Sequence, residues 1–244
     1  MGSRRQAARF LGEARGDVSE ALNNWFQSGA KPEGRSKSID TKKAAAEFRR
    51  LRDEEDGVIN MDGMIQMCEE LGVDPFEDPT VLLIAFYMQA KSLDNVSEED
   101  FLRGFQTMGV STVKQLKSKL NALRGELDTN EGLFAQFFAY AYRVNCPEGM
   151  RVITGDVGIG LLRMLLVPRW DLGEQFVQFL EETKPATITR DTWNQLIPFS
   201  KAHPSSVEGF DEGAAWPVAV DDFVDWMRAN AGRGGGGGAT GSSS

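Results

Sequence analysis

The chain has 244 residues, of which 41% are hydrophobic and 26% charged, proportions that are ordinary for a globular protein with one sizeable core. Its net charge of -9 argues against nucleic acid as a partner, because a surface that binds phosphates needs an excess of Lys and Arg. No apolar run is long enough to cross a bilayer, so we expect no membrane partner.

Cysteine and histidine are scarce, and this scarcity excludes several kinds of catalytic and metal site. Two cysteines, Cys68 and Cys146, are too few for a disulfide scaffold and fit a reducing compartment. The spacing of Cys68 from Met64 and Leu71 indicates a buried, unreactive thiol. A single histidine, His203, cannot build a two-histidine metal site, and we expect it in a loop. We therefore predict no catalytic residue, no metal and no cofactor.

Composition divides the chain into four segments. Residues 1–28 are predicted to form short helices, residues 29–42 a polar linker, and residues 229–244 a disordered tail rich in Gly and Ser. Between them, residues 43–228 show helical periodicity and almost none of the alternation that is typical of strands. The predicted fold class is therefore all-α, with many helices.

The strongest helical patterns lie at 80–90 and 131–144. The first is mostly apolar, which predicts a buried helix, and the second repeats apolar residues at the helical period. The last helix is predicted to begin near Pro217, because the missing N–H of a proline is not needed in a first turn. Its inward face would consist of Val220, Phe223, Val224 and Met227, with Asp221, Asp222 and Asp225 on the outward side.

A short pattern recurs four times, in which an apolar residue precedes a small polar residue and then an acid. It begins at Ile59, Val96, Ile153 and Ile188, so the members of each pair are 37 and 35 residues apart. The polar residue suits a helix N-cap, and the acid suits the positive end of the helix that follows. The apolar residues suit a short ladder with their counterparts. This layout predicts two degenerate EF-hand-like pairs of helix–loop–helix units.

The loops of these units lack the ligands of a calcium site. An EF-hand loop needs oxygen ligands at positions 1, 3, 5 and 12, with glycine at position 6. If Gly57 is position 6, Arg52 occupies position 1 and Gly63 occupies position 12. A cation then replaces the first ligand, and the bidentate acid is missing. A calcium sensor is therefore an alternative function that this loop disfavours.

Three stretches are more specific than helical periodicity. They are Met-Asp-Gly-Met at 61–64 followed by Cys-Glu-Glu-Leu-Gly-Val-Asp-Pro at 68–75, Ile-Thr-Arg-Asp-Thr-Trp-Asn at 188–194, and Ala-Trp-Pro-Val-Ala-Val-Asp-Asp-Phe-Val at 215–224. In this order they closely resemble the potentiating-neddylation (PONY) domain of the defective-in-cullin-neddylation family, over residues 43–228. The resemblance implies a non-catalytic scaffold that promotes cullin neddylation in a ubiquitin ligase complex.

The resemblance implies two binding surfaces, of which the first is an acidic patch for the basic C-terminal domain of a cullin. By motif match, this patch consists of Asp191, Ala215 and Asp221. The alternative is that Asp191 only complements its helix dipole and Asp221 is a solvated charge. We expect Trp193 and Trp216 to be core residues that anchor these segments.

The second implied surface is a hydrophobic pocket for the N-acetylated N-terminus of the neddylation conjugating enzyme. Acetylation removes the terminal charge, so burial of that terminus is no longer prohibitively costly. The alternative is that these side chains fill the core. The matching positions are Met61, Met64, Val81, Leu82, Ile84, Ala85, Met88, Val96, Val144, Leu161 and Met164.

The N-terminal residues 7–27, which contain Ala-Leu-Asn-Asn-Trp-Phe, resemble the last two helices of a ubiquitin-associated (UBA) domain. The first helix of such a domain has no counterpart here, so the segment is predicted to be a partial UBA-like module. Ubiquitin is thus a further candidate partner, and a ubiquitin-binding adaptor is a further alternative function. The expected location of the protein is the nucleus and the cytoplasm.

Overall fold

The computed structural model describes residues 38–147 and 149–231. The predicted UBA-like segment at 1–28 lies outside the described residues. The chain divides after Cys146 into two compact units, each of which has its own core. Within the described part of the chain, no helix combines the length and the apolar character that crossing a membrane would require.

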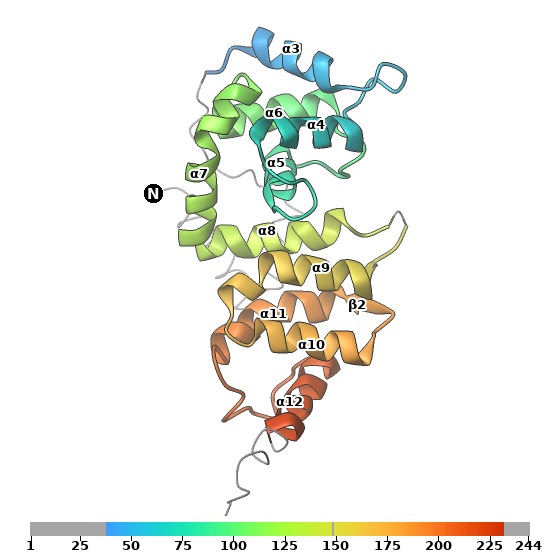
Figure 1. The fold of residues 1–244 in the computed structure, drawn as a ribbon, viewed down its shortest axis with the longest axis vertical. Helices are drawn as coiled ribbons and strands as arrows, with labels where there is room; N and C mark the ends of the chain where they lie inside the picture. Colours follow the sequence, from blue (N-terminus) through green and yellow to red (C-terminus); the bar gives the residue numbers. More distant parts are fainter. Residues whose placement is uncertain (1–37, 148, 232–244) are drawn as a thin grey trace, which may run out of the picture. The chain divides into compact units, whose positions relative to one another are not determined.

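In the first unit, the described residues form six helices: α3 (Thr41–Leu51), α4 (Met61–Leu71), α5 (Thr80–Met88), α6 (Glu98–Met108), α7 (Val113–Thr129) and α8 (Glu131–Val144). Every residue of α5 is buried, and the helix packs against α4, α6 and α8 (Figure 1). A helix with no charged residue has no face for water, so it takes the central position. The helix predicted at 131–144 is confirmed, and the buried helix predicted at 80–90 is confirmed as far as Met88.

The first EF-hand-like pair consists of α3 to α6. Ile59 and Val96 pair in antiparallel fashion through two backbone hydrogen bonds of 3.0 and 2.9 Å. The side chains of Asn60 and Ser97 cap α4 and α6, as the repeated pattern predicts. Gly57 has a φ of 72°, in the left-handed region that favours glycine at such a turn.

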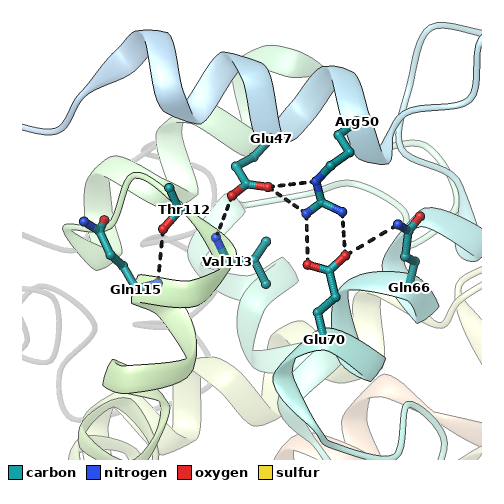
Figure 2. Close-up of polar contacts among 7 residues, drawn as sticks. All are labelled: Glu47, Arg50, Gln66, Glu70, Thr112, Val113 and Gln115. Carbon is teal, nitrogen blue, oxygen red and sulfur yellow. Dashed lines mark hydrogen bonds and ion pairs between the residues drawn. The ribbon is translucent and has the colours of Figure 1, made fainter.

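A polar network joins α3 to α4 and α7 (Figure 2). Arg50 forms ion pairs with Glu47 on its own helix and with Glu70 on α4. The Glu47 carboxylate also accepts a hydrogen bond of 3.3 Å from the backbone N–H of Val113 at the start of α7. Because these side chains are partly exposed, the ion pairs contribute little stability and chiefly orient α3.

The described residues of the second unit form β1 (Val152–Thr154), α9 (Gly155–Leu165), the 3-10 helix η1 (Val167–Arg169), α10 (Gly173–Thr183), β2 (Thr187–Thr189), α11 (Arg190–Ala202) and α12 (Val218–Ala231). α10 packs against both α9 and α12 (Figure 1). The strands β1 and β2 are antiparallel with Ile153 opposite Ile188, which confirms the second predicted pair.

The two helices that follow these strands begin differently. Thr189 caps α11 by accepting a hydrogen bond from the backbone N–H of Thr192, as predicted. Thr154 precedes α9 at the expected position but makes no side-chain cap, so that part of the prediction is wrong. The start of α9 is held instead by a backbone bond of 3.1 Å from Gly155 to the carbonyl of Ala186.

An aromatic cluster forms the core of the second unit. The fully buried Phe223 of α12 has its ring centroid 5.0 Å from that of Phe176 and 6.2 Å from that of Phe199. His203, expected in a loop, follows α11 directly and is buried against Phe199 and Phe210, because the chain after α11 folds back over the cluster. Its backbone carbonyl accepts a hydrogen bond from the Trp170 indole at 2.8 Å.

The last helix begins where the sequence predicts and extends further. α12 starts at Val218, directly after Pro217, and continues to Ala231, which lies three residues into the segment predicted as a tail. Val220, Phe223 and Val224 are buried as predicted, and Met227 is half-buried. The helix therefore turns its apolar side to the core and leaves the opposite side to solvent.

Candidate functional site

The predicted acidic patch lies entirely in the second unit. Asp191 is exposed in the first turn of α11, Ala215 is exposed in the loop before α12, and Asp221 is half-buried in the first turn of α12. No cation among the described residues pairs with Asp191 or Asp221. Both negative charges are therefore available to a partner.

The loop before α12 is fixed by its own hydrogen bonds. The Asp211 carboxylate accepts a bond of 2.9 Å from the backbone N–H of Gly213, and the N–H of Trp216 donates to the carbonyl of Ala214 at 2.9 Å. The half-buried Trp216 ring packs edge-on against Phe199 at 5.5 Å between centroids. This inward tryptophan holds the neighbouring Ala215 at the surface.

Phe199 shows how the parts of the patch are related. Its ring packs against both Trp216 and Phe223, so α11 contacts the loop that carries Ala215 as well as α12. Asp191 precedes Phe199 by eight residues, which corresponds to about 12 Å along a helix. The three predicted residues therefore lie on elements that meet at Phe199, with Asp191 about two helical turns away from that contact.

The outward side of α12 carries further acidic residues. Val218, Asp221, Asp222 and Asp225 follow one another at the spacing of one side of a helix. Arg228 forms ion pairs with Asp225 at 3.6 Å and with Glu212 at 2.7 Å, and it neutralises that end of the row. Asp222, like Asp221, has no ion-pair partner among the described residues. The sequence prediction did not include Val218, although helical periodicity places it beside Asp221.

The residues predicted for the hydrophobic pocket are divided between the two units. Leu161 and Met164 belong to the second unit, and the other nine belong to the first. Five of these nine have no exposed surface: Met64, Ile84, Ala85, Met88 and Val96. Val81, Leu82 and Val144 are also buried, whereas Met61, at the start of α4, is 38% exposed. Most of the nine are thus core residues, and Met61 is the one among them that a ligand can reach directly.

Cys68 and the Asp53 carboxylate of the first unit are engaged within the fold. Cys68 is fully buried, and burial raises the pKa of its thiol to about 11, with smaller contributions from the carboxylates of Asp78 and Asp74. In the first EF-hand-like loop, the Asp53 carboxylate accepts two backbone hydrogen bonds, of 2.8 and 3.0 Å. Among the residues that the structure describes, no three His, Cys, Asp or Glu side chains lie together as a metal site would require.

Comparison with known proteins finds relatives of this chain. A family model described as cullin binding matches residues 115–226, which include all three residues of the acidic patch. DCN1-like protein 5 from Homo sapiens is 30% identical over 173 residues, which are 71% of this chain and 72% of that protein. DCN1-like protein 4 from Drosophila melanogaster is 31% identical over 175 residues, which are 72% of this chain and 70% of that protein.

Proposed function

We propose a function for this chain on the premise that it belongs to the DCN1-like family of cullin-binding proteins. The protein acts as a scaffold that promotes cullin neddylation, the attachment of a ubiquitin-like modifier to a cullin. The observation that carries this proposal is that Asp191 and Asp221 reach the surface of the second unit and have no cationic partner among the residues that the structure describes.

In the proposed cullin contact, Asp191 and Asp221 interact electrostatically with basic residues of the partner. Unpaired carboxylates attract a basic domain, raise the rate of productive encounter and disfavour acidic partners. A small side chain at Ala215 allows the backbone of the partner to approach closely. A single exposed ion pair contributes little, about 0–1 kcal/mol, so the contact must combine several groups over the face.

The proposed second partner is the neddylation conjugating enzyme, which would bring its N-acetylated N-terminus to the hydrophobic residues around Met61. This part of the proposal is supported by the resemblance and by the exposed side chain of Met61. Met64 and Met88 are core residues of the first unit, so the terminus would reach them only if α4 or α5 moved. We expect the enzyme to bind mainly through apolar contacts.

The mechanism that follows is tethering. A scaffold that holds the cullin and the charged conjugating enzyme together makes the transfer effectively intramolecular. In this proposal the attacking and accepting groups belong to the two partners. The buried thiol of Cys68, whose pKa lies well above neutral pH, is not positioned to serve as a nucleophile.

A reconstituted transfer of the modifier to a cullin C-terminal domain tests the proposal. We expect the wild-type chain to accelerate transfer, and the double variant Asp191→Arg and Asp221→Arg to lose both acceleration and binding of the cullin domain. A matched control, Glu54→Arg with Glu98→Arg, changes the net charge equally on exposed residues of the first unit and should bind the cullin domain normally. Unchanged binding by the Asp191 and Asp221 variant would show that the patch is assigned wrongly.

A further inference from the structure

Val218, the first residue of α12, has an exposure that the fold does not explain. Its side chain is 73% exposed, the largest fraction among the large hydrophobic side chains of the described residues. Two residues later, Val220 is completely buried, so the helix has a core side and Val218 is not on it. Single exposed hydrophobic residues are common on protein surfaces, and exposure alone would indicate nothing.

The residues around Val218 distinguish it from a single exposed hydrophobic residue. Asp221 and Asp222 lie three and four residues further along the helix, which places their Cβ atoms about 5–6 Å from that of Val218. Neither carboxylate has an ion-pair partner among the described residues. Ala214 and Ala215 are both exposed and precede Val218 in the loop before α12. A small apolar area is thus bordered by uncompensated negative charge.

This arrangement matches the usual anatomy of a protein–protein interface. The centre of an interface is depleted of charged residues, because desolvating a charge is costly, and charges are concentrated at the rim. Asp191 and Asp221 would supply only rim contacts, whereas Ala215 and Val218 would supply the centre that is shielded from water.

We propose that Val218 is the apolar centre of the cullin-binding face and packs against an apolar side chain of the partner that is flanked by Lys or Arg. This inference rests on the proposed function and deepens it, because it identifies the contact that contributes most of the salt-independent affinity. Charge complementarity selects a basic partner, and the apolar contact selects, among basic surfaces, one with a hydrophobic side chain at its middle.

The two kinds of contact respond differently to salt. Exposed ion pairs weaken as the screening length falls, from about 30 Å at 0.01 M to about 8 Å at 0.15 M ionic strength. Burial of apolar surface is not screened, so the contribution of Val218 should persist at ionic strengths that remove most of the contribution of Asp221. Salt dependence therefore separates a direct apolar contact from an indirect effect on the neighbouring carboxylates.

The test measures affinity of the full chain for a cullin C-terminal domain at about 0.05 M and about 0.5 M NaCl. Val218→Ser should lower the affinity about tenfold at both salt concentrations, which is the loss expected for one buried apolar side chain. Val218→Ile should retain binding. Asp221→Asn should lower the affinity mainly at low salt. The control is Val157→Ser, since Val157 is 41% exposed in the first turn of α9 of the same unit, and it should bind as the wild type does.

The outcomes distinguish failure of the Val218 inference from failure of the proposed function. If the wild type binds and Val218→Ser binds equally well, the inference is wrong and the proposed function stands. If the loss in Val218→Ser disappears at high salt, Val218 acts only through the carboxylates and the inference is also wrong. A wild-type chain that does not bind would overturn the proposed function together with the inference. Thermal unfolding of Val218→Ser should match the wild type, because the side chain is mostly exposed.

Discussion

The chemistry of the two cysteines depends on where each residue lies. Cys68 is fully buried in α4 and burial raises the pKa of its thiol to about 11, whereas Cys146 is partly exposed and donates a hydrogen bond to the carbonyl of Tyr142. At pH 8 a thiol-specific reagent should therefore modify Cys146 rapidly and Cys68 only after unfolding, because the thiolate is the reactive species. Counting modified thiols in native buffer and in urea measures this.

Cys146→Ser provides the control for this experiment, since the native variant should then contain no rapidly reacting thiol. Equal rates for both cysteines in the native protein would show that α4 opens readily. Such opening would also bear on the proposed pocket, because Met64 and Met67 are buried on the same helix as Cys68.

Single residues differ in how well the sequence predicts their surroundings. Trp193 is fully buried, and its place in a helical apolar pattern gives enough information to predict this. The burial of His203 could not be predicted in the same way, since it depends on a turn that carries Phe210 back to Phe199. The exposure of Val218, by contrast, follows from the helical period, because Val220, Phe223 and Val224 face the core.

Two glycines of α9 should respond oppositely to the same substitution. A Cβ at Gly155 would lie only 2.1 Å from the carbonyl oxygen of Pro185, whereas a Cβ at Gly160 would meet nothing within 4 Å. Gly155→Ala should destabilise the protein by about 1–3 kcal/mol, because backbone must move to admit the methyl group. Gly160→Ala should stabilise it by about 0.5–1 kcal/mol, because alanine is the better helix former.

Urea unfolding of the two variants measures this contrast, with each serving as the control for the other. If Gly155→Ala left the free energy of unfolding unchanged or raised it, the close approach of α9 to the segment before β2 would be wrong. The result concerns the second EF-hand-like pair, since Gly155 directly follows β1.

Helices and their pairing were predictable because their signals are local. Each instance of the repeated pattern, at Ile59, Val96, Ile153 and Ile188, spans only a few residues, and the similar separation within each pair predicts which instances form a ladder. Helix ends were less predictable. α5 ends at Met88 because the next residue, Gln89, adopts a left-handed φ of 56°, which its side chain does not signal.

At the scale of the whole molecule, the residues of the two proposed surfaces come from different units. The acidic patch belongs to the second unit alone, while most residues predicted for the hydrophobic pocket belong to the first. The sequence motifs gave the residues of both surfaces through the resemblance. The motifs assigned Met64, Ile84 and Met88 to a pocket, whereas all three are buried where α4, α5 and α6 pack together, as the apolar pattern at 80–90 predicts for two of them.

A tether has a kinetic signature that a simple activator lacks. With the cullin domain and the conjugating enzyme at fixed concentrations, the initial rate of transfer should rise as scaffold is added, because both partners meet on one molecule. Beyond the point at which scaffold exceeds both partners, the rate should fall, because each partner then occupies a separate scaffold. An activator that acts on one partner alone would reach a plateau and stay there. A plateau that persists well above both Kd values would contradict tethering, and the Asp191→Arg and Asp221→Arg variant should show neither the rise nor the fall, because it cannot hold the cullin.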